Sequence, residues 1–162
     1  MRKWLLLVFG YLIFVPPLSA GDDHASATQS LTLTVKPVAC LTVTGNPGPM
    51  LITDATAGTA ELSSSDKTTR YSWTTNLESM KIVASIDARM PDGTALLLNL
   101  ASGNALSKGT VDVSGALSPV DVVTGIGRGT DANESITYTF TAQASAGNVP
   151  DQARTVTLTL TD

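Results

Sequence analysis

The chain has 162 residues, with ten basic and fourteen acidic side chains, a net charge of −4 at pH 7 and a pI of about 4.8. Its Lys and Arg residues are scattered singly, which argues against a nucleic-acid-binding protein, because such proteins gather basic side chains on one face. The single cysteine, Cys40, excludes an internal disulfide and offers no zinc-site spacing.

The N-terminus has the layout of a secretory signal peptide. Arg2 and Lys3 precede an apolar run at residues 4–15, and two prolines and small residues follow it. The run is too short for a transmembrane helix, which needs about 20 residues. Cleavage is expected after Ala20 or after Ala27. Either one predicts a secreted protein, in the periplasm, on the cell surface or outside the cell, without a membrane span after cleavage.

The mature chain is long enough for one domain. Cleavage at the two sites would leave 142 or 135 residues, which can bury a hydrophobic core. We therefore expect a signal peptide over residues 1–27 and a single domain over residues 28–162, in which residues 28–36 form a possible strand-donating extension.

Residues 30–44 read SLTLTVKPVACLTVT and alternate between apolar and polar side chains. The period of two predicts a strand with Leu31, Leu33 and Val35 on one face. Pro37 interrupts it, and because proline has no N–H to donate, it marks a sheet edge, a bulge or a switch between sheets. The alternation leaves open whether residues 30–35 pair within their own sheet or with a neighbouring subunit.

The middle of the chain contains several short strand patterns separated by turns. Tyr71 and Trp73 share one face of their strand, and the apolar run at residues 95–100 is typical of a strand buried on both faces or of a very short helix. Strands are predicted at residues 50–53, 60–62, 70–74, 81–87, 95–100, 110–113 and 120–124.

The clearest pair of strands comes last. Residues 135–142 place Ile136, Tyr138, Phe140 and Ala142 inward, and residues 154–161 place Val156, Leu158 and Leu160 inward. Because no helical pattern accompanies these strands, the chain is expected to be all-β: an antiparallel immunoglobulin-like β-sandwich of about seven or eight strands.

The residues that usually carry catalysis are scarce. The only histidine, His24, lies in the leader or in a ragged N-terminus. Cleavage after Ala27 would leave no histidine to act as the usual general base or to pair with a nucleophile. The glycine-rich residues 125–129 lack the spacing of a nucleotide-binding loop and are expected to form a surface turn. We therefore expect no enzyme, no catalytic residue and no cofactor.

Two features leave alternatives open. Asp131 and Glu134, with Asp121 near them, could offer oxygens to a calcium ion or could be solvated loop residues. Cys40 could be a buried small hydrophobe or an intermolecular or reactive thiol.

Two segments resemble those of bacterial fimbrial (pilin-like) subunits, including the secreted β-sandwich proteins related to spore coat protein U. The stretch LTLTVKPVACLTVT resembles their first strand, and ITYTFTAQASAGNVPDQARTVTLTLTD resembles their final hairpin. Cys40 has no second cysteine for the disulfide that such subunits commonly carry, and the chain lacks their terminal aromatic residue.

The resemblance implies a non-enzymatic structural or surface-interaction protein that assembles by β-strand pairing, with copies of itself or related subunits as partners. Leu31, Leu33 and Val35 would form the donated strand face, Val156, Leu158 and Leu160 the acceptor edge, and Cys40 a possible intermolecular thiol. The alternative is a monomeric extracellular binding domain for a small ligand or carbohydrate, which would use loops around residues 54–69 and 125–134.

Overall fold

The described residues, 27–162 of a computed structural model, consist of strands and loops with one short 3-10 turn. Residues 35–162 form one compact unit, and the residues before Val35 belong to a separate one. The predicted leader falls on residues 1–26, outside the described residues, and stays a prediction.

Ten strands make up the described fold. They are β1 (Ala39–Thr44), β2 (Glu61–Asp66), β3 (Arg70–Thr75), β4 (Met80–Ile86), β5 (Thr94–Leu100), β6 (Leu106–Ser107), β7 (Thr110–Asp112), β8 (Val120–Ile126), β9 (Gly129–Gln143) and β10 (Val156–Thr161). The 3-10 turn η1 (Ala144–Ala146) follows β9.

The strands form two antiparallel sheets. One has the order β1-β3-β9-β5-β7, with β2 also paired to β9, and the other has the order β10-β4-β8-β6. The expected all-β antiparallel sandwich is therefore confirmed, with ten strands in place of seven or eight. Strand β7 falls on the predicted strand at residues 110–113, whereas the two-residue strand β6 was not predicted because it is too brief to show a period in the sequence.

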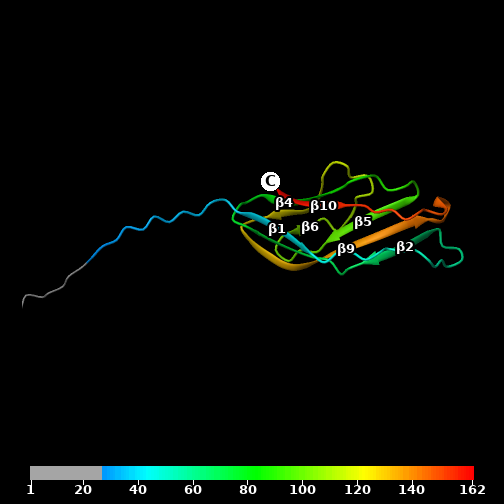
Figure 1. Ribbon diagram of the computed structural model, residues 1–162, viewed down its shortest axis with the longest axis horizontal. Coiled ribbons are helices and arrows are strands. Elements are labelled where there is room, and N and C mark those ends of the chain that lie inside the picture. The colour runs from blue at the N-terminus through cyan, green and yellow to red at the C-terminus, as the bar shows by residue number, and fades with distance from the viewer. Residues whose placement is uncertain (1–26) are drawn as a thin grey trace, which may run out of the picture. The chain divides into compact units, whose positions relative to one another are not determined.

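The long strand β9 organises the larger sheet. Its first half pairs with β3. Its second half lies between β2 and β5, as Figure 1 shows. A register shift between Tyr71 and Trp73 of β3 marks a bulge opposite the middle of β9, and Asn133 there has a φ of +59°. A bulge adds local twist, which lets one strand serve two partners on the same side.

The core lies between the two sheets and follows the predicted alternation. On β3 the buried side chains fall at every second position, as period-two strands require, and β4 shows the same alternation with Val83 buried as well. On β9 only Ile136 and Tyr138 keep this spacing, because the strand is bulged and its burial is otherwise irregular. The fully buried large residues include Tyr71, Ile82, Leu98, Leu100, Val122, Val123, Ile126 and Ile136. Threonine occupies many outward positions, where its branched side chain suits a pleated surface.

Two local predictions were wrong, and a third gave a strand that was too short. Residues 50–53 form no strand, since they have no strand partner and follow the prolines of GNPGP. The weak strand at residues 60–62 is instead the full strand β2, held by pairing with β9 along ELSSSD. Strand β5 is buried on one face only, because its burial alternates and Leu97 on the other face is half-exposed.

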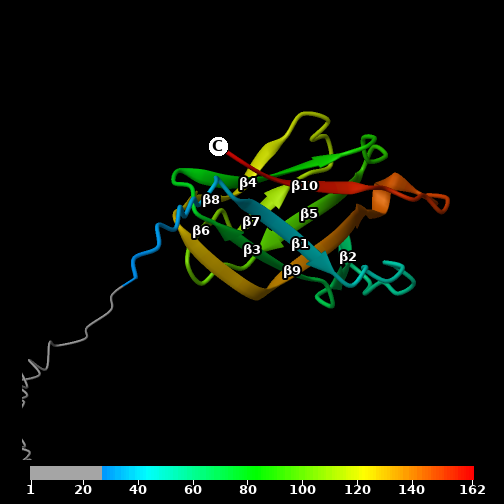
Figure 2. The ribbon, with the colours of Figure 1, turned by 60° about the vertical axis from the view of Figure 1, so that its left-hand side comes forward.

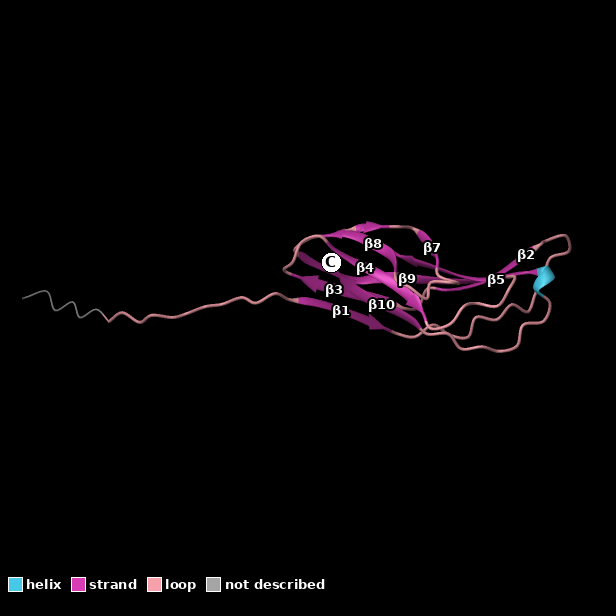
Figure 3. Ribbon diagram, turned by 90° about the horizontal axis from the view of Figure 1, so that it is seen from above, coloured by secondary structure: helices cyan, strands magenta, loops and turns pink. Residues whose placement is uncertain are grey.

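The loops gather mainly at one end of the sandwich. Figure 3 shows several long loop segments near η1 and the adjoining ends of β2 and β5. The segment after β1 and the segment before β10 both belong to this end, which places them on either side of the groove described below.

Candidate functional site

The sandwich has an open side between two edge strands. Among the strands of residues 27–162, β1 hydrogen-bonds only to β3 and β10 only to β4, so each ends its own sheet. The two strands lie near each other without pairing, as Figure 2 shows. Each edge strand carries a row of backbone N–H and C=O groups with no ladder partner, which is a template for another strand.

Side chains on the inner face of β1 are incompletely covered. Leu41 lies opposite Trp73 and Val43 opposite Tyr71 in the β1–β3 register, so all four point to the same face. Tyr71 and Trp73 are buried, yet Val43 is 45% exposed and Leu41 is half-buried. The second sheet therefore stops short of β1 and leaves apolar surface open.

The inner face of β10 shows the same partial cover. Val156, Leu158 and Leu160 alternate with exposed threonines and pack against the core, but all three are half-buried. The predicted inward parity of these residues is confirmed. They lie on an edge strand at the open side, the place that a strand-accepting surface requires.

A groove of about 1250 Å³ continues the open side toward the loop end of the sandwich. Its walls are the segment after β1, residues 46–52, and the segment before β10, residues 147–155. Its apolar lining includes Met50, Leu62, Met90, Leu96, Phe140 and Val156.

Sequence reasoning missed two contributors to this groove. Phe140 was assigned to the core by its parity, but it is only half-buried and faces the groove. Met50 was assigned to a strand, but it belongs to the loop wall. The alternation along the strand identifies the face to which Phe140 points. How far its side chain is buried depends on the opposite sheet, and the local sequence pattern gives no information about that sheet.

The predicted donor face lies in a segment without secondary structure. No strand forms before Ala39 in the described residues. Leu31, Leu33 and Val35 are 77%, 82% and 85% exposed. Residues 30–35 therefore do not complete the protein's own sheet, and three aliphatic side chains stay in contact with water.

Cys40 lies on the outer face of β1 and is exposed and free. It pairs with Thr74 in the ladder, one position out of phase with the inward Leu41. The interpretation of Cys40 as a buried small hydrophobe was therefore wrong, because its parity directs the thiol away from the core.

Asp131 holds a turn to β9. Its side chain is buried, and Oδ2 accepts hydrogen bonds from the Ser102 hydroxyl at 2.9 Å, the Gly103 N–H at 2.9 Å and the Asn104 N–H at 3.1 Å. Burial acts to raise the pKa of Asp131, but these donors, with Asn104 first, outweigh it and hold the pKa below its usual value.

Glu134 lies beside this carboxylate. Burial, and next the negative charge of Asp131, raises the pKa of Glu134. Asp121 is elsewhere and pairs with Lys81, with 3.7 Å between Oδ1 and Nζ, so the three acidic residues do not converge. Within residues 27–162, no three acidic, histidine or cysteine side chains come together where they could hold a metal ion.

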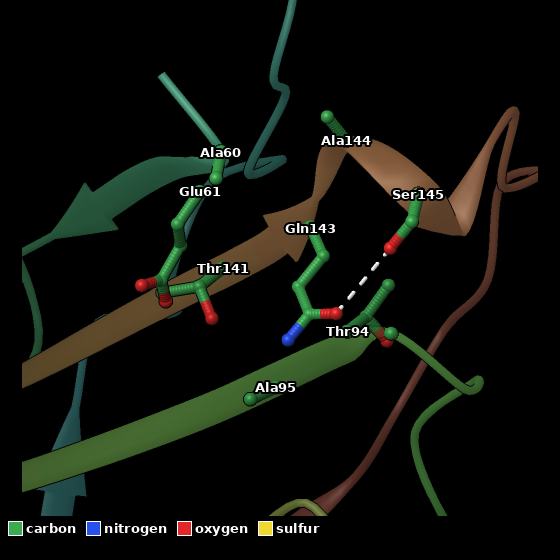
Figure 4. A pocket seen from close by; sticks show the side chains of 9 residues that line it. Ala60, Glu61, Thr94, Ala95, Thr141, Gln143, Ala144 and Ser145 are labelled. Carbon is green, nitrogen blue, oxygen red and sulfur yellow. Dashed lines mark hydrogen bonds between the residues drawn. The ribbon is translucent and has the colours of Figure 1, made fainter. Parts of the chain in front are cut away.

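A second, polar pocket of about 780 Å³ lies at the ends of β2, β5 and β9. Figure 4 shows Glu61, Thr141 and Gln143 around it, with Ser145 donating a hydrogen bond of 3.4 Å to Oε1 of Gln143. Its lining offers one carboxylate, one amide and several hydroxyls and includes no aromatic side chain. Of the ligand-binding loops expected around residues 54–69 and 125–134, residues 54–60 and 67–69 lie outside strands, whereas residues 61–66 form β2 and residues 129–134 belong to β9.

No helix in the described part of the chain is long and apolar enough to cross a membrane. Comparisons of the chain with protein-family models, with curated proteins and with solved structures gave no match.

Proposed function

We propose that this protein is a secreted, non-enzymatic structural subunit, fimbria-like in character, that assembles by β-strand addition. The observation that carries the proposal is the open side of the sandwich. There, two edge strands lie near each other unpaired, with half-exposed apolar side chains between them and a groove of mixed apolar and polar lining beside them. An added strand would satisfy both the backbone groups and the apolar surface.

The occupant is residues 28–35 of a second copy. At about 3.3 Å per residue, these eight residues extend over roughly 26 Å, enough to run the length of the six-residue strand β10. Their alternation places Leu31, Leu33 and Val35 on one side, which suits the half-buried face of β10. Burying three such side chains contributes roughly 5–9 kcal/mol before entropy costs.

Polymer formation by the purified protein, with or without residues 28–35, tests the proposal. We expect oligomers or rods from the intact protein in light scattering and electron microscopy, and monomers after deletion. A matched variant replaces Leu31, Leu33 and Val35 by threonine, which keeps length and strand propensity but removes the apolar face. It should also be monomeric.

The opposite result has a clear meaning. A stable monomer whose size and stability are unchanged by the deletion would overturn the proposal. It would favour a monomeric binding domain that uses the polar pocket at Glu61 and Gln143.

A further inference from the structure

The residues just before β1 are held by the side chain of Asn76. Its Nδ2 donates a hydrogen bond of 2.8 Å to the carbonyl of Lys36, and its Oδ1 accepts one of 2.7 Å from the N–H of Val38. The Asn76 N–H also donates to the Val38 carbonyl at 3.2 Å. One residue thus binds the backbone on both sides of Pro37.

Thr75 fixes the same segment from the core. Its side chain is buried, and its hydroxyl donates to the Val38 carbonyl at 2.9 Å while accepting the N–H of Leu77 at 3.0 Å. The side-chain amide of Asn76 hydrogen-bonds to the carbonyl of residue 36 and to the N–H of residue 38. These are the same two groups to which one residue of a neighbouring parallel strand would bond. These hydrogen bonds extend the ladder between β1 and β3 beyond Ala39 and hold residues 36–38 beside Thr75 and Asn76.

A competing conformation uses one of the same atoms. Residues 36–39 could form a tight turn, since proline is favoured at its second position. In that turn the Lys36 carbonyl would accept the N–H of Ala39, and Val38, at the third position, would have to leave its backbone pairing with Asn76. The turn would fold residues 28–35 back along the free edge of β1 in their own chain.

We propose, resting on the proposed function, that Asn76 and Thr75 select the partner of the N-terminal segment. By holding residues 36–38 on the line of β3, they prevent residues 28–35 from closing the open side of their own chain. The segment then pairs with a second copy, and assembly is favoured over a self-closed monomer.

The test compares wild-type protein with Asn76→Ala, as the host processes both. Monomer and oligomer fractions are separated, and amide hydrogen exchange is measured for residues 28–35 in each. In wild-type protein the segment should be protected in oligomers and unprotected in monomers. In Asn76→Ala the monomer share should rise about 5- to 30-fold, since two hydrogen bonds are lost, and the segment should be protected in monomers.

Two further variants make the result specific. Asn76→Asp keeps the acceptor for Val38 but loses the donor to Lys36, and should shift the balance in the same direction. Asn104→Ala removes a comparable bond of 2.9 Å, from a side-chain amide to the Thr130 carbonyl, and should leave the balance unchanged.

The failures are distinguishable. If both Asn76 variants keep the monomer share of the wild type and leave residues 28–35 unprotected in monomers, the inference is overturned. Strand addition would still be supported in that case, provided that residues 28–35 are protected in oligomers. Protection already present in wild-type monomers would also overturn it. A segment unprotected in every fraction would overturn the proposed function and the inference together.

Discussion

Replacing Asp131 by asparagine should destabilise the sandwich at neutral pH and remove part of its acid sensitivity. Oδ2 accepts three hydrogen bonds, two from backbone N–H groups and one from a hydroxyl. Bonds to a charged acceptor contribute about 1.5–3 kcal/mol each and neutral ones about half as much. Three weakened bonds, partly offset by relief of the buried charge, give a loss of about 1–3 kcal/mol.

The sign of the pH dependence follows from the lowered pKa of Asp131, which the Asn104, Ser102 and Gly103 donors hold down against burial. The folded state favours the charged form of Asp131, so the carboxylate stabilises the fold fully above its unfolded pKa of about 3.9. This stabilisation is lost as the pH falls through the lower pKa that Asp131 has in the folded state. Urea unfolding at pH 7 and at pH 2.5 measures it. The difference in unfolding free energy between the two proteins should be largest at pH 7 and smaller at pH 2.5.

Glu134 provides the matched control, because its pKa is shifted the other way by burial and by Asp131. A raised pKa favours the protonated form in the folded state, so its contribution is present at low pH and lost as pH rises through the folded value. Glu134→Gln should therefore raise the melting temperature at pH 7 and leave it unchanged near pH 3. A difference between wild type and Asp131→Asn that is equal at pH 7 and pH 2.5 would refute this account.

Three further outcomes are expected. Leu98→Ala, at a fully buried position, should lower the free energy of unfolding by about 2–5 kcal/mol, whereas Leu33→Ala, at an exposed one, should change it by less than about 0.5 kcal/mol in the monomer. Cys40 should react completely with a thiol reagent in the native protein, and a thiol that reacts only after unfolding would contradict its exposure. Gly93→Ala should lower the free energy of unfolding by about 1–3 kcal/mol, because Gly93 has a φ of +76° and the new Cβ would lie 2.8 Å from a side chain of η1. Gly48→Ala, whose new Cβ meets no atom within 4 Å, should leave thermal unfolding almost unchanged.

The local alternation of side chains determined most strands and their inward faces. Tyr71, Trp73, Ile136 and Tyr138 are buried as their parity predicts, because successive residues of a strand point to opposite sides wherever the strand lies. The exposure of Cys40 follows from the same rule, because Cys40 lies one position out of phase with the inward Leu41. A residue's face is thus a property of the chain's own geometry.

The order of the strands in each sheet and the burial of the inward side chains were decided only by the tertiary structure. ELSSSD shows little apolar alternation, yet it is strand β2 because β9 supplies its partner. The acceptor for the Ser102–Asn104 turn is Asp131, more than 25 residues away, which no local pattern connects to it. Val43 and Phe140 have inward parity but stay partly exposed. Parity is set by adjacent residues, whereas burial requires another strand to pack there, and at the open side of this sandwich residues 27–162 supply none.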